Sequence, residues 1–246
     1  MPYTQTYFIC GTPRSGSTLL CALLKSSGVA GVPESYFRKQ DELKWAEKFD
    51  LATAADFKTY LQGVIKGGTT PNGMLGIRVM WGTMAEVVDN TRALAPAITG
   101  NDKAVLEHAF GPCKFLYLKR NDIVAQAVSL VRALQTDVWH VVDERGTPTA
   151  KTEPVYNFEQ IHGFVTEMEE HNKAWLEWFA DNDITPYKIE YETYTQDPIT
   201  GTKNVLDYLG VTLPEGKTLE AANKKLSDGL SKEWILRYNA EAGKAG

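Results

Sequence analysis

Cysteine and histidine are scarce in this chain of 246 residues, and their scarcity limits the chemistry that it can perform. Three cysteines are present, Cys10, Cys21 and Cys113, together with four histidines. No two cysteines have the close spacing of a zinc site, and an odd number does not suit a disulfide framework. We therefore expect free thiols in a reducing, cytosolic compartment and no bound metal.

Long apolar runs and an excess of basic charge are also missing. No apolar run approaches the ~18 residues of a membrane span, and no basic segment precedes the first apolar run, so we expect neither a span nor a signal peptide. The chain has 26 basic and 31 acidic residues, a net charge of −5 and a pI of about 5.5. This balance argues against a nucleic-acid binder. It does not exclude a small anion held by a local cluster of cations.

Apolar residues are plentiful. They make up 43% of the chain against 23% charged residues, which is typical of a globular protein and excludes a disordered or collagen-like one. Short apolar segments predict buried strands at residues 7–10, 74–81, 115–118 and 186–191. Periodicity and capping residues predict helices at 19–24, 41–62, 83–95, 122–134, 158–180 and 198–209, with loops at 63–73 and 145–156. Because strands and helices alternate, we expect an α/β fold with a central, mostly parallel sheet flanked by helices.

The segment between the first strand and the first helix has the composition of a phosphate-binding loop. It reads Gly11-Thr12-Pro13-Arg14-Ser15-Gly16-Ser17-Thr18. The backbone N–H groups of such a loop and the positive end of the following helix together hold a phosphate. Gly11 and Gly16 have the spacing of a Walker A loop, but Ser17 occupies the place of its lysine, and Arg14 lies three residues earlier. A tight turn without a ligand is the alternative.

Residues 13–18 resemble the 5′-phosphosulfate loop of sulfotransferases, which differs from the kinase loop in the same way. Those enzymes share a three-layer, P-loop-like fold and use 3′-phosphoadenosine 5′-phosphosulfate (PAPS) without a metal. The resemblance implies that the donor is bound by Pro13, Arg14, Ser15, Gly16, Ser17 and Thr18. It also implies that Arg14 stabilises the leaving phosphate oxygen.

A second element of the sulfotransferase pattern follows a later strand. Arg120 comes at the end of the apolar segment 115–118, and Ser129 lies nine positions further on. In sulfotransferases an arginine and a serine so placed bind the 3′-phosphate, the first through its charge and paired donors and the second through its hydroxyl. In sulfotransferases a basic C-terminal loop covers the same phosphate, and this resemblance makes Lys225 a further candidate.

Matches along most of the chain are closer to one subfamily, the bacterial Stf0 sulfotransferases. They lie at residues 12–20, 28–37, 76–81, 126–129, 135–139 and 226–234. The resemblance implies one sulfotransferase domain over residues 1–246 and in-line transfer of a sulfuryl group to a hydroxyl of a carbohydrate or glycolipid. Stf0-like enzymes are often homodimers, so a homodimer is expected here as well.

The resemblance also supplies candidates for the acceptor side of the site. In Stf0-like enzymes a glutamate shortly after the first helix is the general base, and Glu34 matches that motif position; His140 is the alternative. Candidate acceptor contacts are Tyr36, Phe37, Arg78, Trp81, Trp139 and His140. The aromatic residues could equally belong to the core. Arg78 could pair with Glu34 or bind an acceptor hydroxyl.

Three classes of function are therefore open. A PAPS-dependent sulfotransferase is favoured, with a small sulfate donor and a carbohydrate or glycolipid as its partners. A nucleotide kinase or NTPase is disfavoured by Ser17, and a non-catalytic nucleotide-binding module would retain the loop and lose the base. The sequence leaves the acceptor unidentified.

Overall fold

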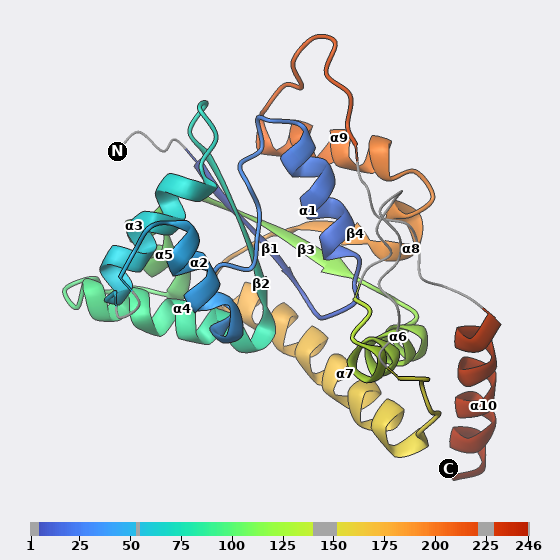
Figure 1. Ribbon diagram of the computed structural model, residues 1–246. Helices are drawn as coiled ribbons and strands as arrows, with labels where there is room; N and C mark the ends of the chain where they lie inside the picture. Colours follow the sequence, from blue (N-terminus) through green and yellow to red (C-terminus); the bar gives the residue numbers. More distant parts are fainter. Residues whose placement is uncertain (1–4, 53–54, 140–151, 221–228, 246) are drawn as a thin grey trace.

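A four-stranded parallel sheet forms the centre of the protein in a computed structural model that describes residues 5–52, 55–139, 152–220 and 229–245 (Figure 1). The strands are β1 (Gln5–Gly11), β2 (Met74–Met80), β3 (Cys113–Lys119) and β4 (Tyr187–Glu190). Their order in the sheet is β2-β1-β3-β4, and each neighbouring pair is parallel. The carboxyl ends of all four strands therefore lie at one edge of the sheet.

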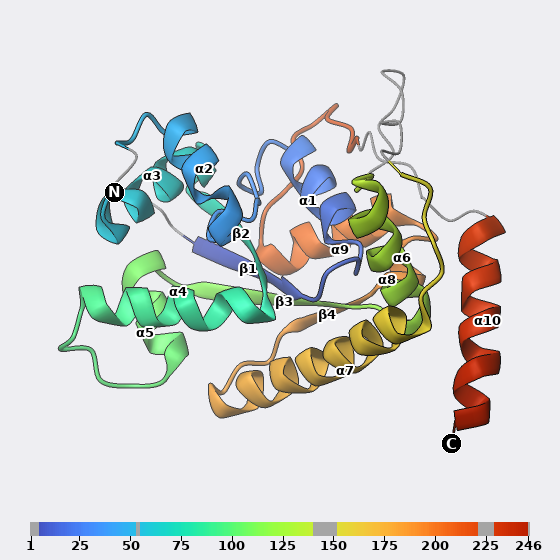
Figure 2. The same ribbon diagram turned by 60° about the horizontal axis from the view of Figure 1, so that its bottom comes forward.

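Ten α-helices are found in the described residues. They are α1 (Ser17–Ser26), α2 (Glu42–Lys48), α3 (Phe57–Gly68), α4 (Trp81–Leu94), α5 (Asp102–Phe110), α6 (Ile123–Thr136), α7 (Phe158–Asp181), α8 (Tyr191–Tyr194), α9 (Pro198–Leu209) and α10 (Gly229–Ala245). Helices α1 and α9 cover one face of the sheet, and α4, α5 and α7 cover the other (Figures 1 and 2). The expected three-layer α/β architecture is confirmed.

Strand β1 shows how the pattern of apolar residues produces these layers. Because side chains alternate across a strand, Tyr7 and Ile9 pack with α1 and α9, whereas Phe8 and Cys10 pack with the helices on the opposite face. All four side chains are buried. The central strand is thus apolar on both sides, as a parallel strand between two helical layers must be.

Two predictions about helices were wrong in detail. The single helix expected at residues 41–62 is two helices, α2 and α3, separated at Asp50, whose φ of 55° is left-handed. Helix α3 continues through Gly63 and Gly67 into the expected loop. These glycines allow a close approach: a Cβ on Gly67 would lie 2.3 Å from Cε1 of Phe49. Helices α5, α8 and α10 were not predicted.

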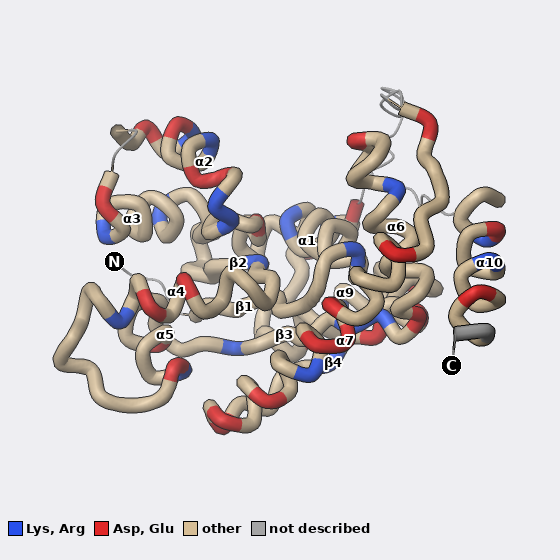
Figure 3. The backbone as a smooth tube through the Cα atoms, turned by 90° about the horizontal axis from the view of Figure 1, so that it is seen from below, with Lys and Arg blue, Asp and Glu red and all other residues tan. Residues whose placement is uncertain are grey.

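Charges of both signs are interspersed along the outer helices, for example on α2 and α10 (Figure 3). In the described residues no helix is long and apolar enough to cross a membrane. The same residues contain no group of three or more His, Cys, Asp and Glu side chains arranged to hold a metal.

Candidate active site

The glycine-containing loop connects β1 to α1, at the carboxyl edge of the sheet (Figure 1). Arg14 and Gly16 have left-handed backbones, with φ of 65° and 91°. Gly16 is the N-cap of α1 and offers no side-chain cap to the first N–H groups of that helix. A Cβ on Gly16 would lie 2.6 Å from Cδ2 of Tyr191, so only glycine fits at this turn. The N-terminus of α1 is left available for an anion.

Two buried side chains fix the loop from outside. Trp175 of α7 donates its indole N–H to the carbonyl oxygen of Gly11 at 3.0 Å. Gln126 of α6 donates its amide to the carbonyl oxygen of Pro13 at 2.6 Å and to the hydroxyl of Thr12 at 2.8 Å. Carbonyls of the loop are therefore turned toward α6 and α7, which favours an anion near the N–H groups.

Arg14 connects the loop to α6. Its Nε donates to the hydroxyl of Ser129 at 3.0 Å, and its Nη1 donates to the carbonyl oxygen of Trp139 at 2.8 Å. Burial lowers the pKa of the Arg14 guanidinium, and the charge of Arg120 lowers that pKa further. The structure thus brings together Arg14, Arg120 and Ser129, which are far apart in the sequence.

Arg120 follows β3 and lies over the ring of Tyr191, with 4.5 Å between its guanidinium carbon and the ring centroid. Its Nε is buried and has no partner among the described residues. The next residue of α8, Glu192, accepts hydrogen bonds from the backbone N–H groups of Asn121 and Asp122, each at 3.0 Å. Desolvation opposes ionisation of Glu192, but these backbone bonds and Arg120 outweigh it and lower its pKa.

The residues present fit a small polyanion such as PAPS. Within the described chain, the hydroxyl of Ser15 and Nε of Arg120 are buried donors without partners. Two neighbouring guanidinium groups repel each other unless an anion lies between or beside them. A helix N-terminus completes the set. These donors are the types that phosphate and sulfate groups accept from most strongly.

Arg78 and Glu34 lie beside the loop but do not pair through their side chains. Arg78 donates from Nε to Ser35 Oγ at 2.8 Å and from Nη1 to Thr18 Oγ1 at 3.0 Å. Its backbone N–H donates to the carbonyl oxygen of Glu34 at 3.0 Å. The Glu34 carboxylate instead lies 3.7 Å from Nζ of Lys25. Lys25 is about two turns further along α1 than Thr18. Ser35, not Glu34, directs its side chain toward Arg78.

The aromatic candidates differ in accessibility. Tyr36 and Phe37 are buried in the core, where Tyr36 packs edge-on against Trp45 at 4.8 Å. Trp81 is only partly buried and packs edge-on against Trp175, with 5.1 Å between ring centroids. Trp139 donates its indole N–H to Asp137 at 3.1 Å. His140 and Lys225 lie outside the described residues.

Sequence reasoning missed the contributions of Trp175, Gln126 and Tyr191 to the site. Trp175 lies on the apolar stripe of α7, which resembles that of any core helix. Tyr191 follows directly after β4, and side chains at the carboxyl ends of parallel strands commonly meet at a ligand. That position was the available signal for Tyr191.

The parallel sheet, the glycine-containing loop without a Walker lysine and the nearby Arg14 and Arg120 are the arrangement expected of a P-loop-like sulfotransferase. A solved structure, the sulfotransferase domain from the curacin biosynthetic pathway, has the same fold: the TM-score is 0.51 at 18% identity, over 86% of this chain and 76% of that one. Residues 6–241 match the family model described as Stf0 sulphotransferase. The chain belongs to the Stf0 sulfotransferase family.

Two curated relatives cover almost the whole chain. Trehalose 2-sulfotransferase of Mycobacterium tuberculosis (strain ATCC 35801 / TMC 107 / Erdman) is 30% identical over 98% of this chain and 97% of its own length. Trehalose 2-sulfotransferase of Mycolicibacterium smegmatis (strain ATCC 700084 / mc(2)155) is 28% identical over 99% of this chain and 98% of its own length.

Proposed function

We propose that this protein transfers the sulfuryl group of PAPS to a hydroxyl of a carbohydrate or glycolipid acceptor. The observation that carries the proposal is the meeting of Arg14, Arg120 and Ser129 at the N-terminus of α1. This arrangement places cationic donors around the loop although Ser17 occupies the place of the Walker lysine.

In this proposal the loop residues and Arg120 bind different parts of the donor. The phosphosulfate end lies on residues 13–18, where backbone N–H groups and the Ser15 hydroxyl donate to it. The 3′-phosphate lies with Arg120 and Ser129, and Lys225 is a further candidate. PAPS would supply the activated sulfuryl group, and adenosine 3′,5′-bisphosphate would be the leaving group.

Charge stabilisation by this chain then provides most of the catalysis. Negative charge develops on the bridging oxygen as the sulfur–oxygen bond breaks, and Arg14 neutralises it from a position already fixed by Ser129 and Trp139. Arg78, fixed on Thr18 and Ser35, offers a second cation beside the loop. No metal is required for these steps.

Glu34 is the proposed general base. Its segment is held beside the end of β2 by the hydrogen bond between its carbonyl and the N–H of Arg78. Its carboxylate is 3.7 Å from Nζ of Lys25, and this ion pair has to open before the carboxylate can take a proton from an acceptor near Thr18.

A disaccharide such as trehalose is the proposed acceptor class, because both curated relatives bear that name. Trp81 is partly exposed, and an indole ring can stack on a sugar. The cytosolic location is supported by the three free thiols, and the homodimer stays a prediction.

A transfer assay with radiolabelled PAPS tests the proposal. The purified protein is incubated with trehalose, maltose, sucrose and a glycolipid, without added metal, and the labelled products are separated. We expect a labelled, sulfated product with at least one of these acceptors. Absence of transfer to every acceptor, together with phosphate release from ATP and magnesium, would contradict the proposal.

A further inference from the structure

Trp175 joins α7 to the first residue of the phosphate loop. Its side chain is fully buried, and its indole N–H donates to the Gly11 carbonyl at 3.0 Å. Trp175 is uncharged and lies outside the loop. This hydrogen bond uses the only polar group of the side chain, because an indole has a single donor and no acceptor.

This hydrogen bond determines the orientation of a peptide plane. The peptide bond between Gly11 and Thr12 is trans, as are all those described. In a trans peptide the carbonyl and the following N–H point in opposite directions. With the Gly11 carbonyl directed at α7, the N–H of Thr12 is directed away from it. Gln126 of α6 donates to the carbonyl of Pro13, two residues further on, and directs that carbonyl toward α6.

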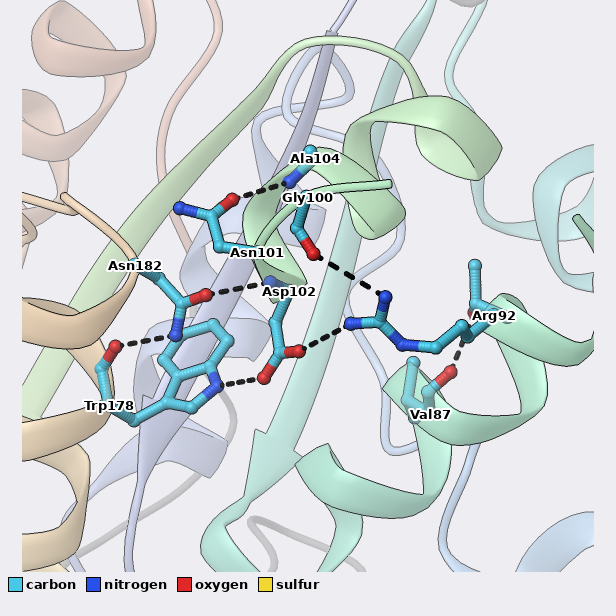
Figure 4. Close-up of polar contacts among 9 residues, drawn as sticks. Val87, Arg92, Gly100, Asn101, Asp102, Ala104, Trp178 and Asn182 are labelled. Atoms are coloured by element: carbon cyan, nitrogen blue, oxygen red, sulfur yellow. Dashed lines mark hydrogen bonds and ion pairs between the residues drawn. The ribbon is translucent and has the colours of Figure 1, made fainter. Parts of the chain in front are cut away.

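One turn beyond Trp175, α7 is anchored to α5 by Trp178, whose ring is in edge-on contact with that of Trp175 at 5.7 Å between centroids. Trp178 donates its indole N–H to Asp102 at 2.8 Å, and Asn182 accepts from the backbone N–H of Asp102 at 2.7 Å (Figure 4). Asp102 is also paired with Arg92 of α4 at 2.9 Å. Helix α7 is thus fixed against α4 and α5 at one end and presents Trp175 to the loop from a rigid support.

We propose that Trp175 is a positioning residue that keeps the phosphate loop in the conformation that binds the 5′ end of the donor. This inference rests on the proposed function. Trp175 contacts neither donor nor acceptor in this role and acts through the Gly11–Thr12 peptide. The edge-on contact of Trp175 with Trp81 places the same indole beside the proposed acceptor platform.

The test compares two ligands that differ only at the 5′ end. Calorimetry measures the dissociation constants of adenosine 3′,5′-bisphosphate and of adenosine 3′-monophosphate, which lacks the 5′-phosphate. In Trp175→Phe, which retains an aromatic ring and loses the N–H, we expect the preference for the bisphosphate to fall about three- to tenfold, the value of one hydrogen bond. Binding of the monophosphate should change little.

Trp178→Phe is the matched control. Residue 178 lies one turn further along the same helix, and phenylalanine keeps a ring against Trp175 while it loses the indole donor, whose partner is Asp102 on α5. We expect this variant to lose thermal stability and to keep the wild-type preference for the bisphosphate. An unchanged preference in folded Trp175→Phe, or an equal fall in both variants, would overturn the inference. The second result would mean that loosening α7 anywhere is sufficient.

If Trp175→Phe does not fold, benzothienylalanine at position 175 replaces it, because this residue has the shape of tryptophan without the N–H. The same fall in preference is expected, and an unchanged preference overturns the inference. Failure of the wild type to bind the bisphosphate would contradict the proposed function itself. The two failures are therefore distinguishable.

Discussion

At the scale of the residue, the approach of Arg14 to Arg120 is the most informative feature of the site. Both side chains are partly buried, and each charge disfavours the other. A protein without an anionic ligand gains nothing from such an arrangement. The stacking of Arg120 on Tyr191 and the hydrogen bonds of Arg14 keep the two cations in place.

Arg120→Met should weaken binding of adenosine 3′,5′-bisphosphate about 10- to 100-fold, because charge-assisted hydrogen bonds to a phosphate are lost. Calorimetry measures the effect, with adenosine 5′-monophosphate as the ligand that lacks the 3′-phosphate and should lose less. Lys119→Met is the matched control, since it removes the same charge from the adjacent position. Equal losses in both variants would show that only net charge matters.

Glu34→Gln should lower kcat by about 100-fold or more if Glu34 is the base, because general-base catalysis contributes that much. Affinity for the bisphosphate should be unchanged. Lys25→Met is the control: it removes the ion pair and keeps the carboxylate, so kcat should be retained. Wild-type kcat in Glu34→Gln would exclude Glu34 as the base.

The resemblance to sulfotransferases predicted that Arg14, Arg120 and Ser129 lie together, and in the structure Arg14 donates to Ser129 and is close enough to Arg120 for its pKa to be lowered. The role of Glu34 stays a prediction, because a motif position does not say which way a side chain points. Glu34 and Ser35 are neighbours in an extended segment, so their side chains diverge, and Ser35 is the one that contacts Arg78. Trp175 was missed since its role depends on a carbonyl that lies 164 residues away.

At the scale of the element, local chemistry predicted helix ends well. Helix α9 begins at Pro198 after Asp197, which accepts from the N–H of Thr200 at 3.0 Å, and it ends before Gly210 with φ of 78°. These are signals within a few residues of each other. The break between α2 and α3 was missed because it depends on Phe49 packing against distant glycines.

Asp102→Ala should lower the free energy of unfolding by about 1–3 kcal/mol, because the indole N–H of Trp178 and the guanidinium of Arg92 lose their partner. Bisphosphate affinity should stay at the wild-type value, since Asp102 bonds to Trp178, whereas Trp175 makes its own hydrogen bond to Gly11. Denaturant unfolding and calorimetry measure the two quantities. Asp181→Ala, an exposed carboxylate on α7, is the control and should change stability by less than about 0.5 kcal/mol.

The buried thiol of Cys21, on α1, should lower the stability of the folded protein at alkaline pH. Burial raises the pKa of the Cys21 thiol to about 11 from its ordinary value of 9.0. Between these two values the unfolded chain loses the proton and the folded chain keeps it, so the free energy of unfolding falls by up to about 1.4 kcal/mol per pH unit. In Cys21→Ala the fall between pH 9 and 11 should be shallower, as measured by urea unfolding. Parallel curves for the two proteins would contradict this.

At the scale of the whole molecule, the sheet explains why the site forms. The loop follows β1, Arg78 lies near the end of β2, Arg120 follows β3 and Tyr191 follows β4. Parallel order brings these four strand ends to one edge. The net charge of −5 does not oppose a small anionic ligand, because the cations of the site are local.

The central claim is that this edge binds a 3′-phosphorylated adenosine nucleotide and does not bind a nucleoside triphosphate. Calorimetric titration of the wild-type protein with adenosine 3′,5′-bisphosphate, and separately with ATP and magnesium, tests it most directly. Micromolar or tighter binding of the bisphosphate without measurable binding of ATP is the predicted result. Tight binding of ATP with magnesium and none of the bisphosphate would contradict the claim.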